Sequence, residues 1–224
     1  MRIAVIHDYA DVFRTTQAYP KLAAHEVVVY TDAYKDPLKA VAQVSGFDAV
    51  VLTNERVQFP RRVIERLPAL KFICQTSVKV SHVDIAACTE YGIVVSAGGH
   101  TANSGYPATA ELAWGLIIGA LRHLPYEVDR LKRGHWQSTV GTRLFGRTLG
   151  VYGYGNIGSS VARVGRAFGM NVLCWGREGS VQRAKAEGFD LAPSRQEFFA
   201  HADVLSLHLP LNKETRGIVT GDDL

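Results

Sequence analysis

The sequence predicts an α/β protein with two domains, each built on a parallel sheet that is covered by helices. Two observations predict this fold. Short apolar runs alternate with helical patterns through the first hundred residues, and a glycine-rich turn follows an apolar run near residue 150. The 224 residues are 47% hydrophobic and 21% charged, an ordinary globular composition whose length allows one large or two small domains.

The first domain is expected over residues 1–100. Pro60 is well placed to begin a helix, and Gly92 follows a helical pattern as a stop signal. The alternation of apolar runs with helices indicates a doubly wound, flavodoxin-like domain. Its predicted strands are Arg2–Ile6, Glu26–Tyr30, Ala49–Leu52, Lys71–Gln75 and Ile93–Ser96, and its predicted helices are Asp36–Val44, Pro60–Leu67 and His82–Glu90.

A connecting helix is predicted from Ala108 to about Leu124. It is apolar almost all round, so we expect it to be buried between domains or between subunits. Gly115 and Gly119 lie four residues apart and provide a smooth face for close packing. A second, amphipathic helix is predicted from Tyr126 to about Lys132.

The second domain, residues 101–224, carries the glycine motif G-x-G-x-x-G. A strand at Thr148–Tyr152, a helical pattern over Ser159–Phe168 and a strand at Asn171–Trp175 surround the motif, which is the context that such a match requires. We therefore predict a Rossmann dinucleotide-binding domain; the alternative is a glycine-rich turn of another α/β protein. The motif residues predicted to contact the cofactor are Gly153, Tyr154, Gly155, Asn156, Ile157 and Gly158.

Each glycine of the motif has a physical role. Gly153 allows a tight turn off the strand, Gly155 lets the backbone approach a pyrophosphate, and Gly158 lets the helix pack closely on the strand. The free amides and the dipole of the helix start then hold the anionic phosphates.

The pattern continues to the end of the chain. Helices are predicted near Val181–Glu187 and at Arg195–His201, followed by a third strand at Asp203–His208. Thr220–Leu224 has the acidic residues after a threonine that suit the capped start of a further helix. We therefore expect only the first βαβαβ half of the dinucleotide-binding domain, with its second half missing.

Composition argues against several other classes of protein. The net charge is +4, but the basic residues are scattered, so no nucleic-acid partner is expected. Cys74, Cys88 and Cys174 have no metal-site or disulfide spacing and favour a reducing compartment. No signal peptide is visible, and the apolar run Leu112–Leu121 is too short to span a bilayer. A cytoplasmic protein without a metal site or a membrane partner is expected.

Taken together, the chain resembles the D-isomer-specific 2-hydroxyacid dehydrogenases, the family of phosphoglycerate dehydrogenase and glyoxylate/hydroxypyruvate reductase. The stretches that carry the resemblance are Asp84–Cys88, Ala110–Leu112, Arg147–Gly158, Ala167–Met170, Ala202–Leu211 and Glu214–Gly217. The resemblance implies hydride transfer between a nicotinamide cofactor and a 2-keto/2-hydroxy acid, and a homodimer. In the family, the catalytic arginine, carboxylate and histidine follow the third strand of the cofactor domain. This chain stops at Leu224, before them, so no catalytic residue is assigned, and the chain is expected to be incomplete and inactive alone.

The cofactor is predicted from the end of the second strand of the cofactor domain. An NAD enzyme usually places a carboxylate there, but this chain has Trp175, Gly176 and Arg177. Arg177 suits a 2′-phosphate, so NADP(H) is favoured and NAD(H) is tolerated. The alternative is that Arg177 is a solvated loop residue and Glu178 compensates for the missing carboxylate.

Two further sets of contacts are predicted. His208, Leu209 and Pro210 follow the third strand and are expected to line the cofactor cleft, although His208 could equally be a structural strand-end histidine. By the resemblance, the backbone N–H groups of Val78 and Lys79 meet the substrate carboxylate, although the usual glycines of that loop are absent.

A second class of function stays open. The same fold serves transcriptional co-repressors, so the alternative is a non-catalytic, dinucleotide-sensing binding protein, which needs no proton-transfer residues. The enzyme is preferred because neither the connecting helix nor the glycine motif indicates a partner-binding segment.

Overall fold

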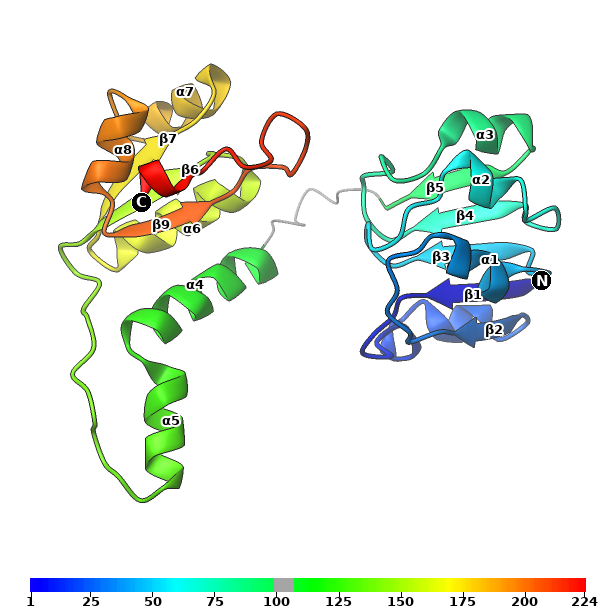
Figure 1. The fold of residues 1–224 in the computed structure, drawn as a ribbon, viewed down its shortest axis with the longest axis horizontal. Coiled ribbons are helices and arrows are strands. Elements are labelled where there is room, and N and C mark those ends of the chain that lie inside the picture. The colour runs from blue at the N-terminus through cyan, green and yellow to red at the C-terminus, as the bar shows by residue number, and fades with distance from the viewer. Residues whose placement is uncertain (99–106) are drawn as a thin grey trace. The chain divides into compact units, whose positions relative to one another are not determined.

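The structure is a computed structural model that describes residues 1–98 and 107–224, and of Pro107 only the backbone. The chain divides into two compact units, Met1–Thr101 and Ala102–Leu224 (Figure 1). The domain boundary predicted between residues 100 and 101 lies outside the described residues.

The first unit is a parallel sheet of five strands in the order β2-β1-β3-β4-β5. This is the flavodoxin-like order, so the predicted doubly wound fold is confirmed. The three helices lie on one face of the sheet in Figure 1. The strands are β1 (Arg2–Ile6), β2 (Glu26–Val29), β3 (Ala49–Leu52), β4 (Phe72–Gln75) and β5 (Val94–Ala97), and the helices are α1 (Leu38–Val44), α2 (Arg61–Ile64) and α3 (Ile85–Glu90).

Alternate residues of the strands supply two apolar clusters. Ala4 and Ile6 of β1 pack beneath the helices, whereas Ile3 and Val5 pack against the segment that contains the 3-10 turns η1 (Phe13–Thr15) and η2 (Tyr19–Leu22). Because the side-chain period of a strand is two, one short strand contributes to both faces. The second face is therefore covered by 3-10 turns among the described residues.

The helices of the first unit begin later than predicted. α1 begins at Leu38 rather than at Asp36, and Asp36 Oδ1 accepts the Leu38 N–H at 3.0 Å just before the N-cap residue Pro37. Asp84 Oδ1 accepts the Ala87 N–H at 2.9 Å, so α3 begins after Asp84 rather than at His82.

The second unit contains a parallel sheet in the order β8-β7-β6-β9. Its strands are β6 (Thr148–Tyr152), β7 (Asn171–Trp175), β8 (Asp190–Leu191) and β9 (Val204–Leu207), and the helices between them are α6 (Asn156–Ala167), α7 (Glu178–Ala186) and α8 (Arg195–His201). The order matches the first four strands of a Rossmann domain, so the predicted Rossmann fold is confirmed.

One strand of this sheet was not predicted. β8 is only two residues long, and the pair Asp190-Leu191 has no apolar run that would indicate a strand. The predicted third strand is therefore the fourth, and β9 pairs with β6 on the side opposite β7. The expectation of a single βαβαβ half is corrected, because β9 occupies the place of the first strand of the second half.

The connecting segment forms α4 (Pro107–Leu121) and α5 (Leu124–Lys132). α4 packs through Ala110 and Trp114 into the cluster under α6, but Leu112 and Leu116 are 63% and 65% exposed. Within the described part of this unit, one face of α4 is therefore covered, and its burial between domains or between subunits stays a prediction. α4 ends at Leu121 because His123 takes a left-handed conformation with φ of 51°.

The chain closes with η3 (Gly221–Asp223), a 3-10 turn where the start of a helix was predicted. Thr220 and Asp223 form a reciprocal capping box, and the Arg195 guanidinium of α8 holds Asp223 Oδ1 at 2.9 Å. These contacts hold the pKa of Asp223 well below its usual range. Within residues 1–98 and 107–224, no helix has the length and apolar character needed to cross a membrane.

Candidate nucleotide-binding site

The turn after β6 has a geometry that only glycine permits at two positions. Gly153 has φ of 97°, and a Cβ there would lie 2.7 Å from the carbonyl oxygen of His208. A Cβ on Gly158 would lie 2.1 Å from the carbonyl oxygen of Gly153. The segment after β9 therefore leaves no room for a side chain at Gly153, and the turn after β6 leaves none at Gly158 of α6.

The N-terminus of α6 is open. Gly155 is its N-cap in an extended conformation, and no side chain caps the helix there. A Cβ on Gly155 would meet no atom of the described residues within 4 Å, so these residues leave space above the turn. The N–H groups of Asn156 and Ile157 lie in the first turn of the helix, where no intrahelical acceptor exists. An uncapped helix start beside a glycine turn fits a phosphate group.

Tyr154 differs from its neighbours in the motif because its polar groups are already bonded within the protein. Its ring is buried, its hydroxyl donates to Glu187 Oε2 at 2.8 Å, and its N–H donates to Ser180 Oγ at 2.6 Å. Burial is the larger cause and the hydrogen bond to Glu187 the second cause that raises the pKa of the Tyr154 hydroxyl. The structure thus places this predicted cofactor contact in the core beneath the turn.

The segment after β9 lies beside the glycine turn. The His208 N–H donates to the Tyr152 carbonyl at 2.8 Å, and Leu209 approaches the position that a Cβ on Gly153 would take. His208 Nε2 and Ser206 Oγ form a hydrogen bond of 2.8 Å, and burial lowers the pKa of the imidazole. The side chain of His208 is therefore anchored to Ser206 of the strand that precedes it. Pro210 follows at the surface.

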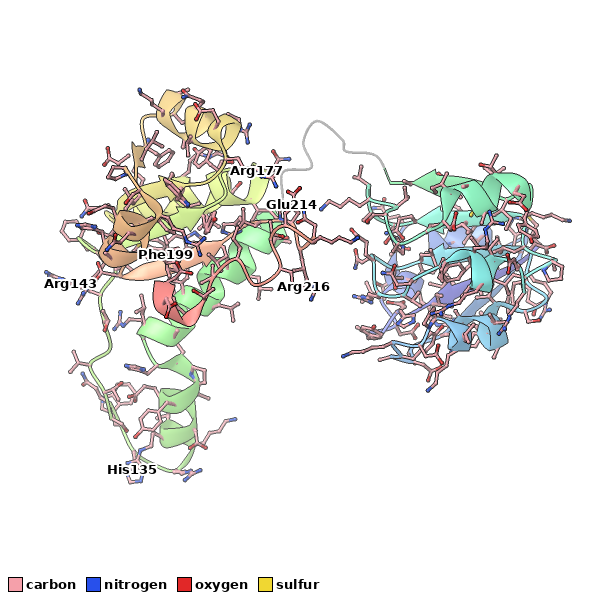
Figure 2. All side chains as sticks on the ribbon, turned by 45° about the horizontal axis from the view of Figure 1, so that its top comes forward. His135, Arg143, Arg177, Phe199, Glu214 and Arg216 are labelled. Atoms are coloured by element: carbon pink, nitrogen blue, oxygen red, sulfur yellow. The ribbon has the colours of Figure 1, made fainter. Side chains whose placement is uncertain are left out.

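The residues after β7 form the other side of the site. Trp175 is half-buried at the strand end, Gly176 follows, and Arg177 is the N-cap of α7. The Arg177 guanidinium pairs with the carboxylate of Glu214, which lies on the loop after β9 (Figure 2). Glu178 instead accepts from the Gln182 side chain of its own helix at 2.6 Å.

Glu214 was not predicted as a site residue. It lies 37 residues beyond Arg177, and no local sequence pattern links the two positions. The strand order places β9 and the loop that follows it near the turn after β6. This arrangement brings Glu214 to the carboxyl end of the sheet, beside Arg177.

The predicted substrate loop lies in the first unit, after β4. Val78 and Lys79 are both exposed there. The loop is held by the Gln75 side chain, which donates to Ser77 Oγ at 2.7 Å, and by Thr76 Oγ1, which accepts the Asn54 N–H at 3.0 Å. The structure thus presents this loop at the carboxyl end of the sheet of the first unit.

Comparisons with known proteins agree with this architecture. Residues 114–224 match the family model of the D-isomer specific 2-hydroxyacid dehydrogenase, NAD binding domain. The chain is 30% identical to a glyoxylate reductase of Aeropyrum pernix over 95% of this chain and 67% of the relative. A crystal structure of a phosphoglycerate oxidoreductase from Vibrio cholerae superposes with a TM-score of 0.91 at 43% identity, covering 100% of this chain and 71% of that one.

Longer relatives are also similar. The chain is 34% identical to a D-3-phosphoglycerate dehydrogenase of Methanocaldococcus jannaschii and covers 36% of that protein. It therefore spans about a third of the length of this relative, and about two thirds of the glyoxylate reductase. By its fold, its glycine turn and these matches, the chain belongs to the D-isomer-specific 2-hydroxyacid dehydrogenase family.

Proposed function

We propose that this chain binds a nicotinamide dinucleotide and a small 2-keto or 2-hydroxy acid, as an NAD(P)-dependent D-2-hydroxyacid dehydrogenase. The observation that carries the proposal is the uncapped start of α6 beneath the turn at Gly153. When bound, the nicotinamide supplies the hydride acceptor or donor, and the protein supplies binding and orientation.

The residues of the turn and of the first turn of α6 have different roles in phosphate binding. The N–H groups of Asn156 and Ile157 donate to the pyrophosphate, and Gly155 allows the close approach because it has no side chain. Gly158 holds α6 against β6, so the amides keep their direction. The walls of the same site are formed by Trp175, Gly176, His208, Leu209 and Pro210.

The absence of a carboxylate at the end of β7 supports NADP(H) as the favoured cofactor, with NAD(H) tolerated. Gly176 stands at that position, and Arg177, which follows it as the N-cap of α7, matches a phosphate in charge and in hydrogen-bond geometry. The hydrogen bond that the Glu178 carboxylate accepts from Gln182 supports the same preference, because it directs this carboxylate along its own helix.

The first unit is proposed to carry the substrate. The N–H groups of Val78 and Lys79, at the carboxyl end of β4, donate to the substrate carboxylate, and the exposed Lys79 ammonium adds positive charge. We assign binding roles only, and no residue of this chain is assigned to proton transfer. We also propose a cytoplasmic location, which the free thiols of Cys74, Cys88 and Cys174 support.

A calorimetric titration of the chain with NADPH and with NADH tests the proposal. We expect saturable binding of one dinucleotide per chain, with the smaller dissociation constant for NADPH because of Arg177. Circular dichroism on the same sample establishes that the protein is folded. A folded chain that gives neither heat nor a tryptophan fluorescence change with either nucleotide would exclude this function.

We further propose that the chain is a homodimer through the α4–α5 region. Leu112 and Leu116 of α4 are exposed, as are Trp136 and Val140 on the segment after α5. A groove of about 500 Å³ lies in this region. Apolar residues that line it are Ile118, Leu124, Val128, Leu131, Trp136 and Val140. An apolar groove with exposed apolar neighbours fits a second copy of the same surface.

Trp136→Ala tests the dimer, because tryptophan anchors contribute most to such interfaces. We expect the dimer dissociation constant from sedimentation equilibrium to rise at least about tenfold. Leu211→Ala is the matched control, since Leu211 is also exposed but lies on the loop after β9. Equal dissociation constants for wild type and Trp136→Ala would place the interface elsewhere.

A further inference from the structure

The ion pair between Arg177 and Glu214 closes the edge of the cofactor site. Arg177 begins α7, and Glu214 lies between β9 and η3. The two side chains meet although they are 75% and 73% exposed (Figure 2). The meeting point lies just beyond the carboxyl end of β7, where a Rossmann domain binds the ribose of the adenosine.

Glu214 is presented by a loop that its own hydrogen bonds hold in shape. Asn212 Oδ1 accepts the backbone N–H groups of Glu214 and Thr215, each at 3.0 Å. The Asn212 N–H donates to Thr215 Oγ1 at 3.0 Å, and that buried hydroxyl donates to the Pro210 carbonyl. These bonds therefore fix the backbone of Glu214, from which its carboxylate reaches Arg177.

The other carboxylate near Arg177 does not compete for it. Glu178 follows Arg177 directly, but its side chain accepts from Gln182 one turn further along α7. Among the described residues, Glu214 thus supplies the carboxylate that pairs with the Arg177 guanidinium.

We propose that Glu214 is a specificity-determining residue that sets the preference between dinucleotides with a 2′-phosphate and those with a free 2′-hydroxyl. This inference rests on the proposed nucleotide-binding function. A 2′-phosphate must displace the Glu214 carboxylate from Arg177, and it carries negative charge toward that carboxylate. A ribose hydroxyl needs neither step, because it can donate to the carboxylate while the ion pair stays in place.

The expected discrimination is modest and depends on salt. Both partners are mostly exposed, so solvent weakens their attraction and the repulsion of a phosphate. Glu214 therefore lowers the preference for the phosphorylated cofactor without abolishing its binding. This accounts for a site in which Arg177 favours NADP(H) and NAD(H) is still accepted.

The experiment compares adenosine 2′,5′-bisphosphate with 5′-AMP, which differ only in the 2′-phosphate, by calorimetry on the 224-residue chain. Glu214→Gln is expected to lower the dissociation constant of the bisphosphate about three- to tenfold and to change that of 5′-AMP by less than about twofold. Arg177→Gln is expected to weaken binding of the bisphosphate. In the double variant, the gain from Glu214→Gln is expected to be smaller than in the presence of Arg177, because only the repulsion between the carboxylate and the phosphate remains.

Glu178→Gln is the matched control, because it makes the same change in net charge one residue from Arg177. Its dissociation constants for both nucleotides are expected to lie within about twofold of the wild-type values. An unchanged ratio of the two dissociation constants in Glu214→Gln overturns the inference, and so does an equal gain in Glu178→Gln. In either case the wild type still binds nucleotide. Failure of the wild type to bind either nucleotide overturns the proposed function instead.

Discussion

Gly155→Val is expected to weaken nucleotide binding strongly while the protein remains folded. A Cβ at this position meets no atom of the described residues within 4 Å, so the first carbon of a side chain has room there. It would, however, occupy the space through which the pyrophosphate reaches the amides of Asn156 and Ile157. Loss of two hydrogen bonds to a charged group corresponds to about 100-fold or more in the dissociation constant, which calorimetry with NADPH would measure.

Gly158→Ala is the comparison variant, because it is expected to change the stability of the fold more than Gly155→Val does. Its Cβ would lie 2.1 Å from the Gly153 carbonyl, so α6 must move away from β6. We expect this variant to lose about 1–3 kcal/mol of unfolding free energy, as overpacking does. Gly155→Val should lose no more than about 1 kcal/mol of unfolding free energy. This loss arises because valine is a poorer N-cap than glycine. NADPH binding by Gly155→Val with the affinity of the wild type would refute the proposed approach of the pyrophosphate.

Trp114→Ala is expected to lower the free energy of unfolding of the second unit by about 3–5 kcal/mol. Trp114 is 5% exposed, and its ring centroid lies 5.0 Å from that of Phe168 at the end of α6. It anchors α4 to the nucleotide-binding unit together with Ala110. Urea denaturation followed by circular dichroism would measure the change.

Trp136→Ala provides the matched control for this substitution. Trp136 is 81% exposed, so the same truncation removes almost no buried area from the chain itself. Measured at concentrations at which the protein is monomeric, it should change the unfolding free energy by less than about 0.5 kcal/mol. Similar losses for Trp114→Ala and Trp136→Ala would show that α4 is not attached through Trp114.

The strands could be predicted closely because their apolar runs are bounded by clear stop signals. β1, β3, β6 and β7 have the predicted bounds, and the strand order confirms both fold classes. β8 was missed because a strand of two residues gains its only pairing from β7, and no local pattern records that pairing. Strand order likewise depends on contacts between distant segments.

The site was predictable only in part, for the same physical reason. The glycine motif is local, so the turn and the open start of α6 follow from consecutive residues. The contact of Arg177 with Glu214 depends on how two loops meet across the sheet. The exposure of Leu112 and Leu116 could not be predicted either, because an apolar helix pattern does not say which of its faces the same chain covers.

The most direct test of the central claim is a crystal structure of the chain with NADP bound. We expect the pyrophosphate oxygens within hydrogen-bond distance of the Asn156 and Ile157 amides, above Gly155. Well-ordered nucleotide whose pyrophosphate lies away from the start of α6 would contradict the assignment of this turn as the phosphate-binding site.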